Sequence, residues 1–240
     1  MIPVTASAAP ARLPRSGASH GFYVGMAMAA VLIIVSAFGP KLVERPAGSS
    51  PMALRVAIHV TLFLTWTALF AAQTLLIATR RARTHRRLGY ASLAVAAAMI
   101  LTAPELAIGF ARRGGPDGGD PLAFLLVLLT DILLFTAFVG GAVYFRRRRD
   151  VHKRLMILAM LDLLPAAIVR WPIAPPNVGP AVTGVVLVLI AALVVNDFAV
   201  QRRAHPASVW GGLLLLGSIP LRFAVAQTAL WHHFAGWLVR

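Results

Sequence analysis

One long apolar stretch, residues 52–79, most constrains what this chain can fold into. It is 28 residues long, and a helix of about 20 apolar residues already crosses the hydrocarbon core of a bilayer. Within it, His59, Trp66 and Gln73 are spaced seven residues apart, so they lie close to one face of a helix. A histidine and a glutamine at membrane depth face protein or water rather than lipid. The stretch therefore predicts a membrane-spanning helix with one protein-facing side.

The composition agrees with a membrane protein. Hydrophobic residues make up 59% of the chain and the mean hydropathy is +0.78, whereas soluble domains contain roughly 45–50% apolar residues. The absence of cysteine excludes disulfides, thiolate-bound zinc and iron–sulfur clusters within the chain. The net charge of +15 comes mainly from short turns between apolar runs, which is how membrane proteins set their orientation. The expected partner is therefore the lipid bilayer and not a nucleic acid.

The apolar runs predict an all-α polytopic membrane bundle of about seven transmembrane helices. Residues 1–20 are expected to form a flexible arm, residues 21–226 the transmembrane domain, and residues 227–240 an interfacial tail anchored by Trp231 and Trp237. The first helix is expected to end at Phe38-Gly39-Pro40. The predicted spans are residues 21–38, 52–79, 88–111, 122–145, 155–171, 181–200 and 208–226.

The orientation follows from the distribution of Lys and Arg. Basic turns follow the second, fourth and sixth predicted spans, so all three should lie on one side of the membrane. With the amino-terminal arm, that side carries 15 Lys and Arg residues, against 6 on the other side. The positive-inside rule then predicts a cytoplasmic amino terminus in a bacterial inner membrane.

A set of polar side chains falls within the predicted spans. Each ionisable group costs at least about 2.5–3.5 kcal/mol at membrane depth when unpaired, so we expect pairs. Similar depths favour Glu105 or Asp131 with Arg170 or Arg222, with His59 as a further candidate. Such a set can line a polar cavity for a cofactor, an anion or a proton path, or it can fix helix packing through ion pairs. The full set is His59, Gln73, Glu105, Asp131, Asp162, Arg170, Asp197 and Arg222.

Each basic turn also contains one histidine: His85, His152 and His205. Imidazoles gathered at the cytoplasmic mouth could ligate a metal ion, or two of them could be axial ligands of haem. Neighbouring arginines such as Arg86 and Arg154 would suit phosphates or haem propionates. Alternatively, these are interfacial histidines beside lipid head groups, because one histidine in each of three turns is not a metal-ligand spacing.

Several short motifs together resemble an uncharacterised family of bacterial multi-pass membrane proteins. They are FGP (residues 38–40), H-x6-W-x6-Q (59–73), HRRLG (85–89), HKRLM (152–156) and HP (205–206). The HRRLG and HKRLM segments are also similar to segments of small membrane proteins linked to haem-copper oxidase assembly and of cytochrome b561-type proteins. This resemblance implies a redox context, with haem or a metal ion as cofactor and a respiratory membrane complex as partner.

Three functions remain open from the sequence. The first is a haem- or metal-binding protein, or a protein that assists assembly of a respiratory complex. The second is a small transporter or a proton or ion pathway that uses the intramembrane polar set. The third is a membrane enzyme acting on lipid head groups. Phosphate-binding glycine loops, G-x-S-x-G and H-E-x-x-H are all absent, so no motif identifies a reaction.

Overall fold

The computed structural model describes residues 16–43, 53–116, 118–171, 173 and 178–240. These residues form eight helices and no strand. The helices are α1 (Ser16–Val43), α2 (Leu54–Ala78), α3 (Ala82–Arg112), α4 (Pro121–Tyr144), α5 (Arg149–Ile168), α6 (Val178–Gln201), α7 (Pro206–Ala226) and α8 (Ala229–Leu238). The all-α bundle predicted from the apolar runs is confirmed.

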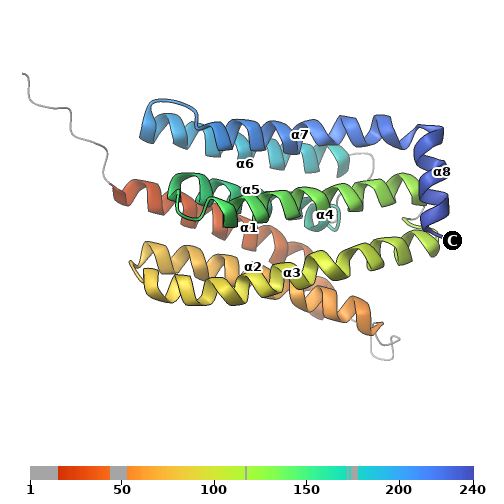
Figure 1. The fold of residues 1–240 in the computed structure, drawn as a ribbon, viewed down its shortest axis with the longest axis horizontal. Coiled ribbons are helices and arrows are strands. Elements are labelled where there is room, and N and C mark those ends of the chain that lie inside the picture. The colour runs from red at the N-terminus through yellow and green to blue at the C-terminus, as the bar shows by residue number, and fades with distance from the viewer. Residues whose placement is uncertain (1–15, 44–52, 117, 172, 174–177) are drawn as a thin grey trace, which may run out of the picture.

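Seven of these helices lie side by side in alternating directions, and the short α8 lies across one end of the bundle (Figure 1). The α2–α3, α4–α5 and α6–α7 turns all lie at the opposite end, together with the start of α1 (Figure 1). We call this the basic end, defined by its three turns, residues 79–81, 145–148 and 202–205. The expectation that the basic turns gather on one side is thereby confirmed.

Six helices are long and apolar enough to cross a membrane: α1, α2, α3, α4, α6 and α7. The chain is therefore a multi-pass membrane protein. The predicted fifth span, α5, is not among the six, and it carries four charged residues near its start and Asp162 further along. Its 20 residues extend about 30 Å at 1.5 Å per residue, enough to traverse the bundle beside the others.

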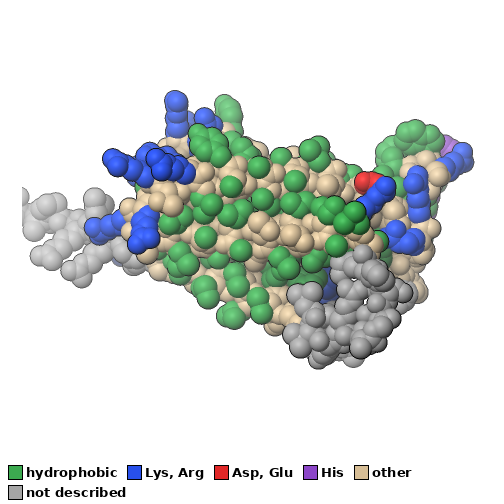
Figure 2. All heavy atoms as spheres, turned by 90° about the horizontal axis from the view of Figure 1, so that it is seen from below, with side chains coloured by type: hydrophobic (Ala, Val, Ile, Leu, Met, Phe, Trp, Pro, Cys, Tyr) green, Lys and Arg blue, Asp and Glu red, His purple; other side chains and the backbone are tan. Residues whose placement is uncertain are grey.

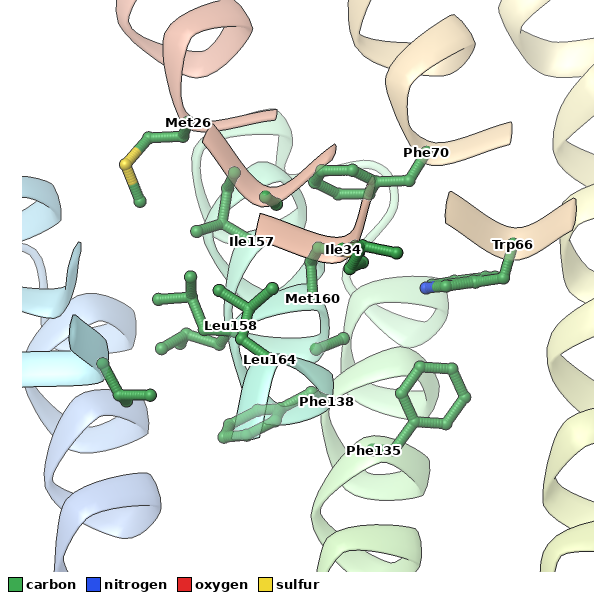
Figure 3. Close-up of a cluster of buried hydrophobic side chains, with 14 of the residues drawn as sticks. Met26, Ile34, Trp66, Phe70, Phe135, Phe138, Ile157, Leu158, Met160 and Leu164 are labelled. Carbon is green, nitrogen blue, oxygen red and sulfur yellow. The ribbon is translucent and has the colours of Figure 1, made fainter. Parts of the chain in front are cut away.

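α5 tolerates these charges because protein surrounds it. It packs against α1, α4, α6 and α7, and ten of its residues are buried. Leu158, Met160 and Leu164 on α5 point into a core shared with Ile34 of α1 and Phe138 of α4 (Figure 3). A helix that faces other helices need not meet the apolar composition that lipid contact requires.

The outer surface of the bundle suits lipid. Leu101 and Leu133, from the middle of α3 and α4, are largely exposed although they are apolar. Figure 2 shows hydrophobic side chains over the long middle of the molecule and Lys and Arg side chains mainly at its two ends. Exposed apolar side chains in a band between charged ends are what a bilayer-embedded surface requires.

Helix limits differ from the predicted spans mainly near the turns. α1 does not end at Phe38-Gly39-Pro40 but continues through Pro40, which removes its own N–H donor without ending the helix. α1 also begins at Ser16, inside the expected arm, whose first 15 residues lie outside the described residues. α3 begins at Ala82, so His85 belongs to its first turns rather than to a loop.

The tail contains one buried and one exposed tryptophan. Trp231 packs beside Ala107, Ala111 and Leu125, and its Nε1 donates to the carbonyl oxygen of Leu122 at 2.9 Å. Trp231 therefore faces protein, because its ring fills the junction between α8, α3 and α4. Trp237 is exposed, as an interfacial residue would be.

Candidate functional site

At the basic end, His85 and His152 come together. Their ring centroids are 6.5 Å apart and the rings are nearly perpendicular. The Nδ1 atom of each ring lies near a carbonyl oxygen of the preceding helix, at 3.3 Å from Gln73 and 2.8 Å from Ala142. A carbonyl can only accept, so each Nδ1 donates, and in its neutral form each ring keeps its lone pair on Nε2. This is the tautomer in which Nε2 can accept a proton or bind a metal ion.

His205, the third histidine, has different partners. Its Nδ1 accepts a hydrogen bond from the Ala207 N–H at 3.1 Å and so caps α7, while its Nε2 lies 2.9 Å from Oδ2 of Asp150. The hydrogen bond from His205 lowers the pKa of the Asp150 carboxyl below its usual range. Both ring nitrogens of His205 are therefore engaged. In the described part of the chain, no group of three or more histidine, aspartate or glutamate side chains is arranged to hold a metal ion.

The two arginines of the predicted mouth differ in accessibility. Arg86 is exposed, but Arg154 is 1% exposed and its guanidinium group forms an ion pair with Asp197 of α6. The Arg154 Nε donates to Oδ1 of Asp197 at 3.0 Å, and Nη1 donates to the carbonyl oxygen of Asp150 at 2.7 Å. Arg154 is thus committed to a buried pair and is not presented to a ligand at the mouth.

Deeper in the bundle, Asp131 of α4 and Arg222 of α7 form the expected carboxylate–arginine pair. The Arg222 Nη1 donates to Oδ1 of Asp131 at 2.7 Å, and Nη2 donates to the hydroxyl of Ser218 at 2.8 Å. Asp162 of α5 is 3% exposed and lies within electrostatic range of both members of the pair. Its Oδ2 is buried and has no hydrogen-bond partner among the residues that the structure describes. We call Asp131, Asp162 and Arg222 the central cluster.

The remaining predicted charges lie outside this cluster. Glu105 pairs with Arg55 of α2, and both side chains are mostly exposed, at 61% and 74%. Arg170 donates to the carbonyl oxygen of Ala166 and lies 4.9 Å from the centroid of the Phe38 ring. The expected alternative pairing of Glu105 with Arg170 or Arg222 is therefore wrong. Glu105 pairs with Arg55 because it lies on the outer side of α3, next to the start of α2.

The α2 face predicted to contact protein does so. Trp66 is buried and packs edge to face against Phe135, with ring centroids 5.1 Å apart, as Figure 3 shows. The Gln73 Nε2 donates to the hydroxyl of Ser92 at 3.1 Å. However, in the described part of the chain His59 Nδ1, Trp66 Nε1 and Gln73 Oε1 are all buried without a hydrogen-bond partner. Buried polar atoms of this kind call for water or a ligand.

Sequence reasoning missed several partners at these sites. Ser218 lies four residues before Arg222, and this i, i+4 spacing places both side chains on one helix face. Asp150 was visible as the single acid in its basic turn. Tyr23 of α1 gave no signal, although its buried ring receives the Lys153 ammonium at 4.4 Å from the ring centroid.

Comparisons with protein-family models, with curated proteins and with solved structures find no match for this chain. The function must therefore be argued from the geometry of its own residues.

Proposed function

We propose that this protein provides a proton pathway through the membrane, with Asp162 as the group that binds and releases the proton. The observation that carries the proposal is the composition of the central cluster, two carboxyl groups and one guanidinium group inside the helix bundle. Ionisable groups at this depth that serve only packing should be paired one to one, because an unpaired charge in the bundle is costly.

Charge balance favours Asp162 as the residue that binds and releases the proton. The hydrogen bond at 2.7 Å joins Arg222 to Asp131, so the one positive charge of the cluster is already used. Asp162 then needs a counter-charge of its own, which a bound proton or a bound cation can supply. A metal cation needs several oxygen ligands, whereas Oδ2 of Asp162 has no hydrogen-bond partner among the described residues. A proton needs only the carboxyl oxygen itself.

Polar groups continue from Asp162 toward the basic end. Arg154 lies eight residues earlier on α5, about 12 Å at 1.5 Å per residue, and it joins Asp197 there. The unpartnered polar atoms of His59, Trp66 and Gln73 form a second row along α2, which ends where His85 contacts the Gln73 carbonyl. Water molecules would carry protons between successive polar groups along α5 or along α2.

The test is proton flux into vesicles that contain the purified protein. A potassium gradient with valinomycin provides the driving force, and an enclosed pH-sensitive dye reports the internal pH. We expect flux well above that of protein-free vesicles, and we expect Asp162→Asn to reduce it to the protein-free level, because the amide keeps the shape but binds no proton. Glu105→Gln is the matched control, since it removes a carboxyl group from the exposed pair outside the cluster. Equal flux in wild type and Asp162→Asn would refute the proposal.

A second candidate function rests on His85 and His152. Their shared tautomer leaves two Nε2 lone pairs on neighbouring rings, an arrangement that supports binding of a metal ion or axial ligation of haem. The resemblance to haem-copper oxidase assembly proteins favours this candidate, with a respiratory complex of a bacterial inner membrane as the partner. An absorption spectrum and metal analysis of the purified protein, with His85→Ala as the comparison, test it directly.

A further inference from the structure

The basic end contains a groove that the proton pathway does not use. It lies between the α4–α5 and α6–α7 turns and has a volume of about 540 Å³. Phe145 and Val151 provide apolar wall, and Arg148 and Arg203 provide charge. Both arginines are exposed, and the Arg148 guanidinium carbon lies 5.8 Å from the centroid of the Phe145 ring. The groove therefore combines an apolar wall with a cationic rim.

The charge in this groove favours an anion. The described lining contains one carboxylate, Asp150, which is bonded to His205, against two arginines, so positive charge is in excess. Arginine presents paired N–H donors to phosphate oxygens, which suits a phosphate better than a single carboxylate.

Neighbouring aromatic residues give the depth of the groove. Tyr144, next to Phe145, is 78% exposed, and Trp210, one helical turn beyond Pro206, is 71% exposed. Exposed Tyr and Trp at the ends of spanning helices mark the level of the lipid head groups. Leu213 and Leu214 of α7 continue the exposed apolar surface from Trp210 toward the middle of the bundle. A phosphate in the groove would thus have apolar surface beside it for acyl chains.

We propose that this groove is a binding site for the head group of an anionic phospholipid, with Arg148 and Arg203 contacting its phosphate. Basic pockets between helices on the positively charged side of a membrane protein are the general setting for such sites. This inference is independent of the proton pathway, because neither arginine belongs to the central cluster.

The test is native mass spectrometry of the full chain, released from detergent after incubation with phosphatidylglycerol, phosphatidylcholine or inorganic phosphate. We expect wild-type protein to retain phosphatidylglycerol in preference to phosphatidylcholine, and Arg148→Gln/Arg203→Gln to weaken that retention by about ten-fold or more. Arg148→Lys/Arg203→Lys keeps both charges but not the paired N–H donors, so its retention should lie between that of wild type and that of the Gln pair.

The matched control is Arg83→Gln/Arg87→Gln, which removes two exposed arginines of α3 outside the groove. It should leave phosphatidylglycerol retention unchanged, and a melting curve for each variant reports whether the fold is intact. An equal loss in the control pair would mean that general charge attracts the lipid and would overturn the site. Equal retention of phosphatidylcholine would overturn the anionic preference. Displacement of the lipid by inorganic phosphate at the same concentration would show that the groove takes a free anion, and would overturn the lipid as its ligand.

Discussion

At the scale of single residues, the buried Arg154–Asp197 pair shows how charges are accommodated inside this bundle. Oδ1 of Asp197 accepts two hydrogen bonds from the Arg154 guanidinium group, and Oδ2 accepts one from the backbone N–H of His205 at 3.3 Å. The Arg154 Nη1 also donates to the carbonyl oxygen of Asp150. The pair thus connects α5, α6 and the start of α7, and its buried polar atoms have partners, which a buried ion pair requires to be tolerated.

We predict that Asp197→Ala lowers the free energy of unfolding by about 3–5 kcal/mol, because it leaves the Arg154 charge buried without a partner. Denaturation followed by circular dichroism in detergent measures the change. The double variant Arg154→Met/Asp197→Leu should recover most of the loss, since no charge then remains in the site. If Asp197→Ala is as stable as wild type, the Arg154–Asp197 pair does not contribute to the free energy of unfolding.

At the scale of helices, α5 can lie at the centre because α7 approaches it closely. Gly211 of α7 lies directly against the Leu158 side chain of α5, and a Cβ at Gly212 would come within 2.6 Å of Ile190 Cγ2 of α6. Small residues at such positions allow helix backbones to approach one another in membrane proteins. The contact surrounds α5 with protein on the side where it carries Asp162.

A methyl group at Gly211 should therefore separate α7 from α5. We expect Gly211→Ala to destabilise the protein by about 1–3 kcal/mol, because Leu158 is fully buried and has little room to move. Gly217→Ala in the same helix is the control, since a Cβ there meets nothing within 4 Å. Thermal melting of both variants measures the difference. Equal melting temperatures would show that α7 is not in tight contact with α5 at Gly211.

At the scale of the whole molecule, charge is distributed unequally between the two ends of the bundle. The three basic turns lie together at one end, while α8 and the α3–α4 loop lie at the other (Figure 1). The positive-inside rule predicts that the basic end faces the cytoplasm. The groove between Arg148 and Arg203 would then face the cytoplasmic leaflet, where membranes carry anionic lipid.

The absence of cysteine makes this orientation simple to test, because one introduced cysteine is the only thiol in the chain. We predict that Thr84→Cys and Arg147→Cys react with a membrane-impermeant maleimide only after the cells are opened, whereas Gln227→Cys reacts in intact cells with a permeable outer membrane. All three positions are exposed. Labelling of Thr84→Cys and Arg147→Cys from opposite sides of the membrane would contradict the topology.

The sequence alone determined the helices, their alternation and the gathering of the basic turns. Apolar length specifies a spanning helix because lipid offers no hydrogen-bond partners, and an alternating chain must bring every second turn to the same end. It also predicted that Asp131 and Arg222 could pair, since residue counting along each helix gives depth. It identified the α2 face of His59, Trp66 and Gln73 from seven-residue spacing alone.

Only the tertiary structure decided which residue meets which. Depth does not specify the direction in which a side chain points around its helix, nor which helices are neighbours. Glu105 therefore pairs with Arg55 instead of Arg170 or Arg222, and Arg154 pairs with Asp197. His205 contacts Asp150 instead of the other two histidines. For the same reason, the sequence could not reveal that two carboxyl groups, those of Asp131 and Asp162, would lie near a single guanidinium group that is bonded to Asp131. That imbalance, on which the proposed proton pathway rests, depends on the packing of α4, α5 and α7 around one point.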